Sequence, residues 1–304
     1  MRKALSISGG SSKRDHKVVV TLLGQQVEIE RRGTDGDFKE AARLFREYDG
    51  QVDALGAGGL ELGMQVFDRY YPMHASMRVI KDVKKTPVTN GDGLKYILER
   101  RVMPYIQERI GDEIQPRRAL ICSAVDRFGM TMSFFDAGYA PQDVVFGDLM
   151  FALGLPVPVR GLKSLERLAR ILLPVVAYLP MSVIYPTGEK QELHTPKFEK
   201  WYNWATVIAG DCIFIKHYSP HRMDGKTVVT NTTTARDVEI FRERGVKYLV
   251  TTTPRFEGGR TFGTNATEAA LIAVSGKGRR LTYDELEDML DELGFVPTIL
   301  KLND

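Results

Sequence analysis

The chain has 304 residues, of which 43% are hydrophobic and 27% charged, a composition that can bury a sizeable core. Its 42 Lys and Arg against 39 Asp and Glu give a formal net charge of +3, an excess too small to favour nucleic acid or a membrane surface as a partner. Two cysteines, Cys122 and Cys212, are too few for a disulfide scaffold and fit a reducing compartment. The N-terminus lacks the apolar run of a signal peptide, and the longest apolar stretch, 171–185, is interrupted by prolines and too short for a membrane span. We therefore expect a soluble, cytoplasmic protein.

The first third of the chain alternates short apolar stretches with amphipathic ones. We expect, in chain order, a strand over 4–8, a hairpin over 17–23 and 26–30, a helix over 38–48, a strand over 52–55 and a long helix over 94–110. Gly24 marks the turn of the hairpin, and Pro104 predicts a kink in the long helix. The strand over 52–55 leads into the glycine run 56–59.

The rest of the chain repeats a strand, a turn of small or polar residues and an amphipathic helix. The predicted strands are 118–122, 144–146, 181–185, 206–209, 227–230 and 248–250, and the clearest helices end near Ala137 or span 162–172, 236–244 and 281–293. This alternation is typical of a mostly parallel sheet covered by helices. We therefore predict an α/β protein, with a Rossmann-like sheet and helices on both faces over 118–304 and an N-terminal α/β domain over 1–117. Whether the N-terminal part is separate or completes the same sheet stays open.

Polar and hydroxylated residues gather directly after successive predicted strands. In open α/β sheets ligands bind beyond the carboxyl ends of the strands, where loops and helix N-termini meet. Any one such loop can be explained by turn or capping chemistry alone. Five loops at one edge favour a ligand site.

Two turns have features of a dinucleotide site. The first is the glycine run 56–59, after which Glu61 stands where the dinucleotide-binding motif has its third glycine. A tight turn or close backbone packing explains these glycines equally well. In the second, Gly129 opens a helix after the strand over 118–122, although Asp126 replaces the second glycine. Asp148 ends the following strand, where an acid binds the ribose and selects NAD over NADP. The residues predicted to contact NAD or NADP are Ser123, Asp126, Arg127, Gly129, Asp148, Asn231, Thr232 and Thr251.

Lys190 and Asp211 are the candidate catalytic residues, because both follow strands and a Lys–carboxylate pair can orient a hydroxyl and move its proton. A solvent-exposed ion pair is the alternative. Arg255 and Arg260 suit a substrate carboxylate or phosphate, and Asn265 either caps a helix or faces the substrate.

The histidines and the second cysteine do not suggest a metal or a nucleophile. Only His217 and His221 are four residues apart, and Ser219-Pro220 between them argues against a helical zinc pair, so no metal is expected. Cys212 is predicted to be a packed core thiol.

The segments 125–130, 185–191 (YPTGEKQ), 230–234 and 251–265 resemble a bacterial family of quinate 5-dehydrogenases. The resemblance covers nearly the whole chain. It implies a Rossmann-type fold and NAD(P)-linked oxidation at C5 of quinate. The better understood shikimate and quinate dehydrogenases place their glycine-rich turn later in the chain, so no catalytic residue is carried over from them.

The leading hypothesis is an NAD(P)-dependent dehydrogenase of a small hydroxylated carboxylic acid. The alternatives are a Rossmann-like enzyme of another class, acting on a nucleotide or phosphorylated metabolite, and a non-enzymatic module that senses a metabolite. The expected partner is a small anionic substrate, without nucleic acid or membrane, and a homodimer is an open alternative for the assembly.

Overall fold

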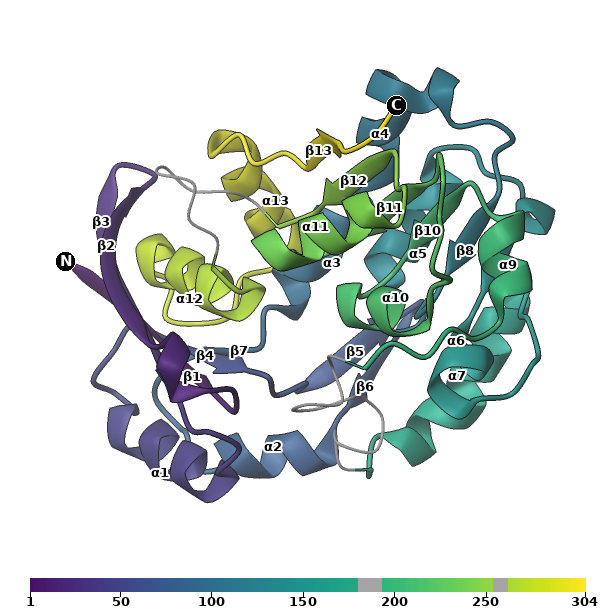
Figure 1. The fold of residues 1–304 in the computed structure, drawn as a ribbon. Coiled ribbons are helices and arrows are strands. Elements are labelled where there is room, and N and C mark those ends of the chain that lie inside the picture. Colours follow the sequence, from purple (N-terminus) through teal and green to yellow (C-terminus); the bar gives the residue numbers. More distant parts are fainter. Residues whose placement is uncertain (180–192, 254–261) are drawn as a thin grey trace. The chain divides into compact units, whose positions relative to one another are not determined.

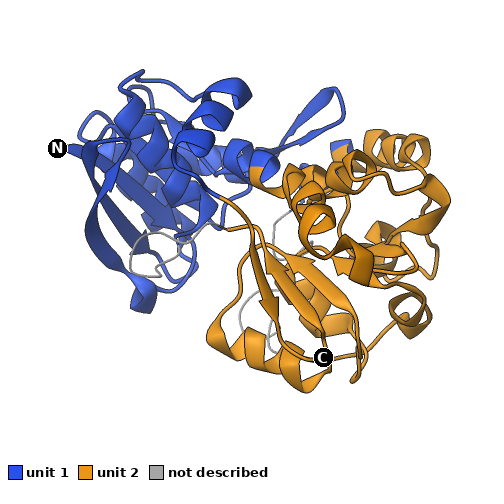
Figure 2. Ribbon diagram, turned by 90° about the horizontal axis from the view of Figure 1, so that it is seen from above, with its two compact units in different colours: residues 1–97, 174–181, 255–295 blue, residues 98–173, 182–254, 296–304 orange. Residues whose placement is uncertain are grey.

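The computed structural model describes residues 1–179, 193–253 and 262–304. The chain divides into two compact units (Figure 2): unit 1 is residues 1–97, 174–181 and 255–295, and unit 2 is residues 98–173, 182–254 and 296–304. These units differ from a single boundary after residue 117, because the helix Thr264–Ser275 returns to pack on the N-terminal sheet. Among the described residues, no helix is long and apolar enough to cross a membrane.

Unit 1 is built on a five-stranded sheet in the order β2-β3-β1-β4-β7. Four strands run parallel, and β2 pairs antiparallel with β3 in the hairpin predicted around Gly24. The strands of this sheet are β1 (Arg2–Ser8), β2 (His16–Leu22), β3 (Gln25–Gly33), β4 (Ala54–Gly58) and β7 (Val88–Thr89). A separate antiparallel pair is formed by β5 (Gly63–Val66) and β6 (Arg69–Pro72). The helices of unit 1 are α1 (Phe38–Tyr48), α2 (His74–Ile80), α12 (Thr264–Ser275) and α13 (Tyr283–Glu292).

The two faces of the unit 1 sheet carry side chains of different size. On one face, Leu5, Ile7 and Leu55 form a core with Phe45 of α1. That helix has the predicted bounds, since Asp37 caps it by accepting the N–H groups of its first turn. The other face is lined by small residues and packs against α12 (Figure 1).

The predicted long helix is two helices, α3 (Asp92–Arg100) and α4 (Val102–Ile110). The chain breaks at Arg101 and not at Pro104. Pro104 lies in the first turn of α4, where a missing N–H costs no intrahelical hydrogen bond. The prediction of a kink at Pro104 was therefore wrong.

Unit 2 is built on a six-stranded sheet in the order β13-β12-β11-β10-β8-β9, in which only β13 runs antiparallel to its neighbour. Its strands are β8 (Ala119–Ile121), β9 (Val144–Phe146), β10 (Val207–Ala209), β11 (Thr227–Thr230), β12 (Tyr248–Thr251) and β13 (Thr298–Lys301). Its further helices are α5 (Phe128–Asp136), α6 (Asp148–Leu153), α7 (Leu162–Val176), α9 (Glu199–Trp204), α10 (Cys212–Tyr218) and α11 (Ala235–Glu243). Helix α7, like α3, contains residues of both units. The strand predicted over 181–185 lies outside the described residues.

Helices cover both faces of the unit 2 sheet (Figure 1). On one face Leu120 and Ile208 share a buried cluster with Phe214 of α10 and Phe241 of α11. On the other face the ring of Phe146 lies 6.4 Å from that of Phe135 in α5. The α/β fold with a mostly parallel, helix-covered sheet is thus confirmed.

Candidate functional site

The candidate site lies at the carboxyl ends of the parallel strands of unit 2. Strand β8 has β9 on one side and β10 on the other, so the chain leaves β8 at a topological switch point. Helices that follow neighbouring strands go to opposite faces at such a point and leave a crevice for a ligand. The loops after β8, β9, β10, β11 and β12 all open at this edge.

A buried guanidinium joins three carboxylates at the switch point. The Nη1 atom of Arg127 donates to Glu99 at 2.7 Å, and its Nη2 atom donates to Asp211. Its Nε atom lies 3.2 Å from the carboxylate of Asp126. The side chains of Arg127, Glu99 and Asp211 are 10%, 1% and 4% exposed, so this network is nearly dry. Charge-assisted hydrogen bonds of this kind fix the position of the β8–α5 loop.

Asp211 is engaged by its own helix and by a neighbouring strand. Its Oδ1 atom accepts the N–H of Ile213 at 2.9 Å and so caps α10. Its Oδ2 atom also accepts the Nδ2 amide of Asn231 at 3.2 Å. Asp211 therefore acts here as an anchor between loops. Lys190, its predicted catalytic partner, lies outside the described residues, and so do Arg255 and Arg260.

Asp148 holds the turn over 123–129, which was predicted to contact the dinucleotide. Its carboxylate accepts the N–H groups of Val125 at 2.9 Å and Ala124 at 3.2 Å. These two backbone donors face a carboxylate and not an incoming phosphate. Burial raises the pKa of Asp148 to about 6, although the two N–H groups act in the opposite direction. Gly129 is buried in the first turn of α5, where it packs in the core.

Hydroxyl groups link the loops of β10, β11 and β12. Thr230 donates to the carbonyl of Gly210 at 2.8 Å, and the hydroxyls of Thr232 and Thr253 are 2.5 Å apart. Thr251 is buried within β12. Thr232 is exposed, so this frame reaches the surface of the unit.

Ser123 supplies a buried hydroxyl at the switch point. Its Oγ atom has no hydrogen-bond partner within residues 1–179, 193–253 and 262–304. It lies beside Gly210, where a Cβ atom would come within 3.4 Å of it. An unpaired buried hydroxyl costs about 1–3 kcal/mol, so a ligand group that bonds to it is favoured.

The described edge is rich in negative charge. Glu99 and the loops after β8 to β10 contribute four carboxylates, three of which pair with the guanidinium of Arg127. The carboxylates are those of Glu99, Asp126, Asp148 and Asp211. Two unit charges of one sign 4 Å apart repel by roughly 4 kcal/mol at an effective dielectric constant of 20. Hydroxyl groups suit this edge better than a phosphate does.

The structure thus brings Asp126, Arg127, Asp211 and Asn231 together, as their positions after neighbouring strands predict. Sequence reasoning missed Glu99, which comes from α3 and completes the pairing of Arg127. No local pattern distinguishes Glu99 from the exposed Glu108. Only the burial of its helix does so.

The residue predicted to bind substrate from the last part of the chain, Asn265, belongs to unit 1. Its Nδ2 atom donates to Ser6 of β1 at 2.8 Å. A Cβ atom at Gly56 would lie 2.8 Å from the backbone of Asn265, and one at Gly58 would lie 2.8 Å from its side chain. Gly56 and Gly58 therefore allow α12 to approach β4, which is the packing explanation, whereas Gly59 has a φ of +65° and serves the turn after the strand.

Comparison with curated protein sequences finds no match. Three solved structures are similar to the chain: the glucose-galactose binding protein GanP of Geobacillus stearothermophilus, the malic enzyme of Entamoeba histolytica and the NAD-dependent malic enzyme of Thermotoga maritima. All three are 10% identical, at TM-scores of 0.40, 0.39 and 0.37. The matches cover 99%, 84% and 95% of this chain, and 97%, 50% and 83% of the respective structures. At these scores none of the three assigns a function.

Two family models match the sequence. That of the domain of unknown function DUF8753 covers residues 3–90, and that of the domain of unknown function DUF8754 covers residues 93–302. Because the second model matches well over half of the chain, the protein belongs to the DUF8754 family.

Proposed function

We propose that unit 2 binds a small hydroxylated molecule at the carboxyl edge of its sheet. The observation that carries the proposal is the buried Ser123 hydroxyl at the switch point, next to a rigid frame of carboxylates and hydroxyls. Asp126 lies within the same network and is partly exposed, so its carboxylate can accept hydrogen bonds from ligand hydroxyls.

The charge of the edge supports a hydroxylated ligand over a phosphorylated one. Hydroxyl groups donate to carboxylates without bringing further negative charge, whereas a pyrophosphate would bring its own negative charge to an edge that carries four carboxylates. A small hydroxylated acid remains compatible if its own carboxylate points away from this cluster. Arg255 and Arg260, predicted from the sequence, would serve that carboxylate.

The test uses quinate and its deoxygenated counterpart, cyclohexanecarboxylate, in calorimetric titrations. We expect quinate to bind at least tenfold more tightly, since only quinate can reach the polar frame through hydroxyl groups. Ser123→Ala should weaken quinate binding about five- to tenfold, which corresponds to the loss of one hydrogen bond. Because Ser123 has no protein partner in the described chain and its unpaired hydroxyl costs free energy, the variant should melt at or above the wild-type temperature. Equal affinity for the two acids, or unchanged affinity in Ser123→Ala, would refute the proposal.

A second candidate is the NAD(P)-dependent dehydrogenase of a small hydroxylated carboxylic acid. One observation favours it: Asp148 follows β9, the strand next to β8, which is where the ribose-binding acid of a dinucleotide fold stands. In this reading Lys190 and Asp211 would move the proton of the reacting hydroxyl. Quinate, the substrate implied by the sequence resemblance, belongs to the ligand class proposed above.

Direct titration with NAD and NADP separates the two candidates. The dehydrogenase predicts binding in the micromolar to millimolar range and a marked loss in Asp148→Asn. It also predicts that adding quinate reduces the nicotinamide, which is measured by the absorbance of the reduced cofactor. Quinate binding without binding of either dinucleotide would leave the first candidate and reject the second.

A further inference from the structure

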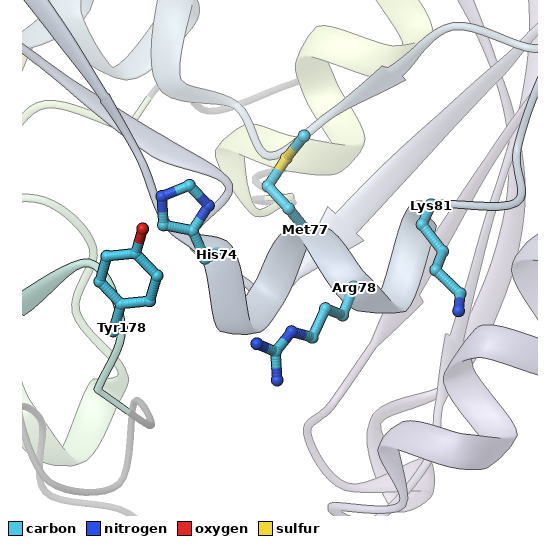
Figure 3. Close-up of a pocket in the computed structure, with 5 residues that line it drawn as sticks. All are labelled: His74, Met77, Arg78, Lys81 and Tyr178. Carbon is cyan, nitrogen blue, oxygen red and sulfur yellow. The ribbon is translucent and has the colours of Figure 1, made fainter.

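A cavity of about 350 Å³ lies in unit 1, apart from the elements that build the unit 2 site (Figure 3). It is lined by His74, Met77, Arg78, Lys81 and Tyr178. Four of these residues stand at positions i, i+3, i+4 and i+7 of α2 and its C-terminal cap, which places them along one side of the helix. The volume is within the range of small-molecule sites.

The apolar part of the cavity is an exposed aromatic surface. The rings of His74 and Tyr178 stack with centroids 4.4 Å apart and planes inclined by 27° (Figure 3). The backbone N–H of His74 donates to the carbonyl of Ala177 at 2.9 Å and holds the two segments together. Even so, the side chain of Tyr178 is 65% exposed and that of Met77 is 40% exposed. A large aromatic ring held in place and left open can stack with a planar ligand.

The other part of the cavity carries the positive charges of Arg78 and Lys81. Neither Arg78 nor Lys81 forms an ion pair with a carboxylate in the described chain. The nearest acid in sequence, Asp82, pairs with Arg46 instead, at 3.5 Å. A surface ion pair contributes little to stability, so the lack of a carboxylate partner in the described chain costs Arg78 and Lys81 little. Two such cations beside an aromatic surface can bind a phosphate group.

We propose that this cavity binds a nucleotide. The base would stack on the exposed ring of Tyr178, whose other face is covered by His74, and Arg78 and Lys81 would bind the phosphate. The helical rise of 1.5 Å per residue places Lys81 about 10 Å along the axis from His74, so the aromatic and cationic parts are separated as a base and its phosphate are. Both recognition elements come from one rigid helix and the short segment bonded to it. The proposal is independent of the function proposed for unit 2.

Calorimetric titrations of the full chain with AMP, adenosine and inorganic phosphate test the proposal. We expect AMP to bind, and adenosine and phosphate each to bind at least tenfold more weakly, because each engages only one part of the cavity. The double variant Arg78→Gln/Lys81→Gln should lose at least tenfold in AMP affinity, about 1.4 kcal/mol. Tyr178→Ala should lose affinity for both AMP and adenosine and leave that for phosphate unchanged.

The matched control is Lys39→Gln/Lys163→Gln, which removes two exposed cations elsewhere and keeps the same net charge as the double variant. It should bind AMP as the wild type does. No AMP binding, or equal loss in the two double variants, would overturn the proposal. So would AMP binding that is abolished by Asp148→Asn and unaffected by Arg78→Gln/Lys81→Gln, since the nucleotide would then occupy unit 2. Finally, Arg78→Gln/Lys81→Gln could change the sedimentation coefficient and leave the AMP affinity unchanged. That result would identify the surface as a contact between copies of the chain and would overturn the proposal.

Discussion

Replacing Arg127 by methionine removes the guanidinium that pairs with the buried carboxylates of both Glu99 and Asp211. Those two side chains are 1% and 4% exposed, so water cannot replace the guanidinium without rearrangement of the loop. Breaking a buried ion pair from one side costs about 3–5 kcal/mol, because it leaves an uncompensated charge. For a unit of this size, that corresponds to a fall of about 6–20 °C in melting temperature.

Tryptophan fluorescence in a urea titration measures this loss selectively. Both tryptophans of the chain, Trp201 and Trp204, belong to unit 2, so the signal reports the unfolding of that unit. The control is Arg222→Met, which breaks an ion pair with Asp224 whose side chains are 66% and 60% exposed. We expect the control to lose less than about 1 kcal/mol.

The reasoning is refuted if Arg127→Met and the control lose the same free energy of unfolding. A second variant keeps the test informative should Arg127→Met fold poorly. Adding Glu99→Gln to Arg127→Met removes one of the uncompensated charges, so the double variant should be more stable than Arg127→Met alone. A double variant that is less stable would show that the loss comes from packing.

Three further predictions concern single residues. Burial raises the pKa of Asp148 from 3.8 to about 6, so its contribution to stability is full below pH 3.8 and is lost as the pH rises through 6. The free energy of unfolding of unit 2 should therefore fall by up to about 3 kcal/mol over this window. Urea titrations at several pH values measure the fall, and Asp148→Asn should flatten it. Gly58→Ala should lower the stability of unit 1 by about 1–3 kcal/mol, because the new Cβ atom would lie 2.8 Å from the Asn265 amide. Hydrogen exchange of unit 1 peptides should accelerate in this variant, and the exchange rate should partly recover in Gly58→Ala/Asn265→Ala. Burial raises the pKa of Cys122 to about 12, so a thiol reagent should leave it unmodified in native protein and react after denaturation; rapid native labelling would contradict its placement in the core.

Local signals predicted many of the elements. The helix over 38–48 has its predicted bounds because Asp37 caps it and its apolar residues share one face. The capping box of Thr282 and Glu285 likewise marks the start of α13. The strand predicted over 52–55 begins later and continues into the glycine run. There the glycines belong to the strand because α12 packs on them, a contact more than 200 residues away in sequence.

The same distinction applies to the candidate site. Asp126, Asp211 and Asn231 could be grouped from the sequence, since parallel strands end at a common edge. Their roles could not be inferred, because they depend on long-range partners. Asp211 follows a strand in the sequence, but only the fold shows that it binds Arg127 and caps α10 at the same time. The contribution of Glu99 depends in the same way on α3 and α5 meeting in space.

Density for a bound ligand tests the central claim most directly. A crystal structure of the protein soaked with quinate should show the acid at the carboxyl edge of the unit 2 sheet, with one of its hydroxyl groups within about 3.2 Å of the Oγ atom of Ser123. Density for quinate in any other place, with Ser123 left without a ligand contact, would contradict the account.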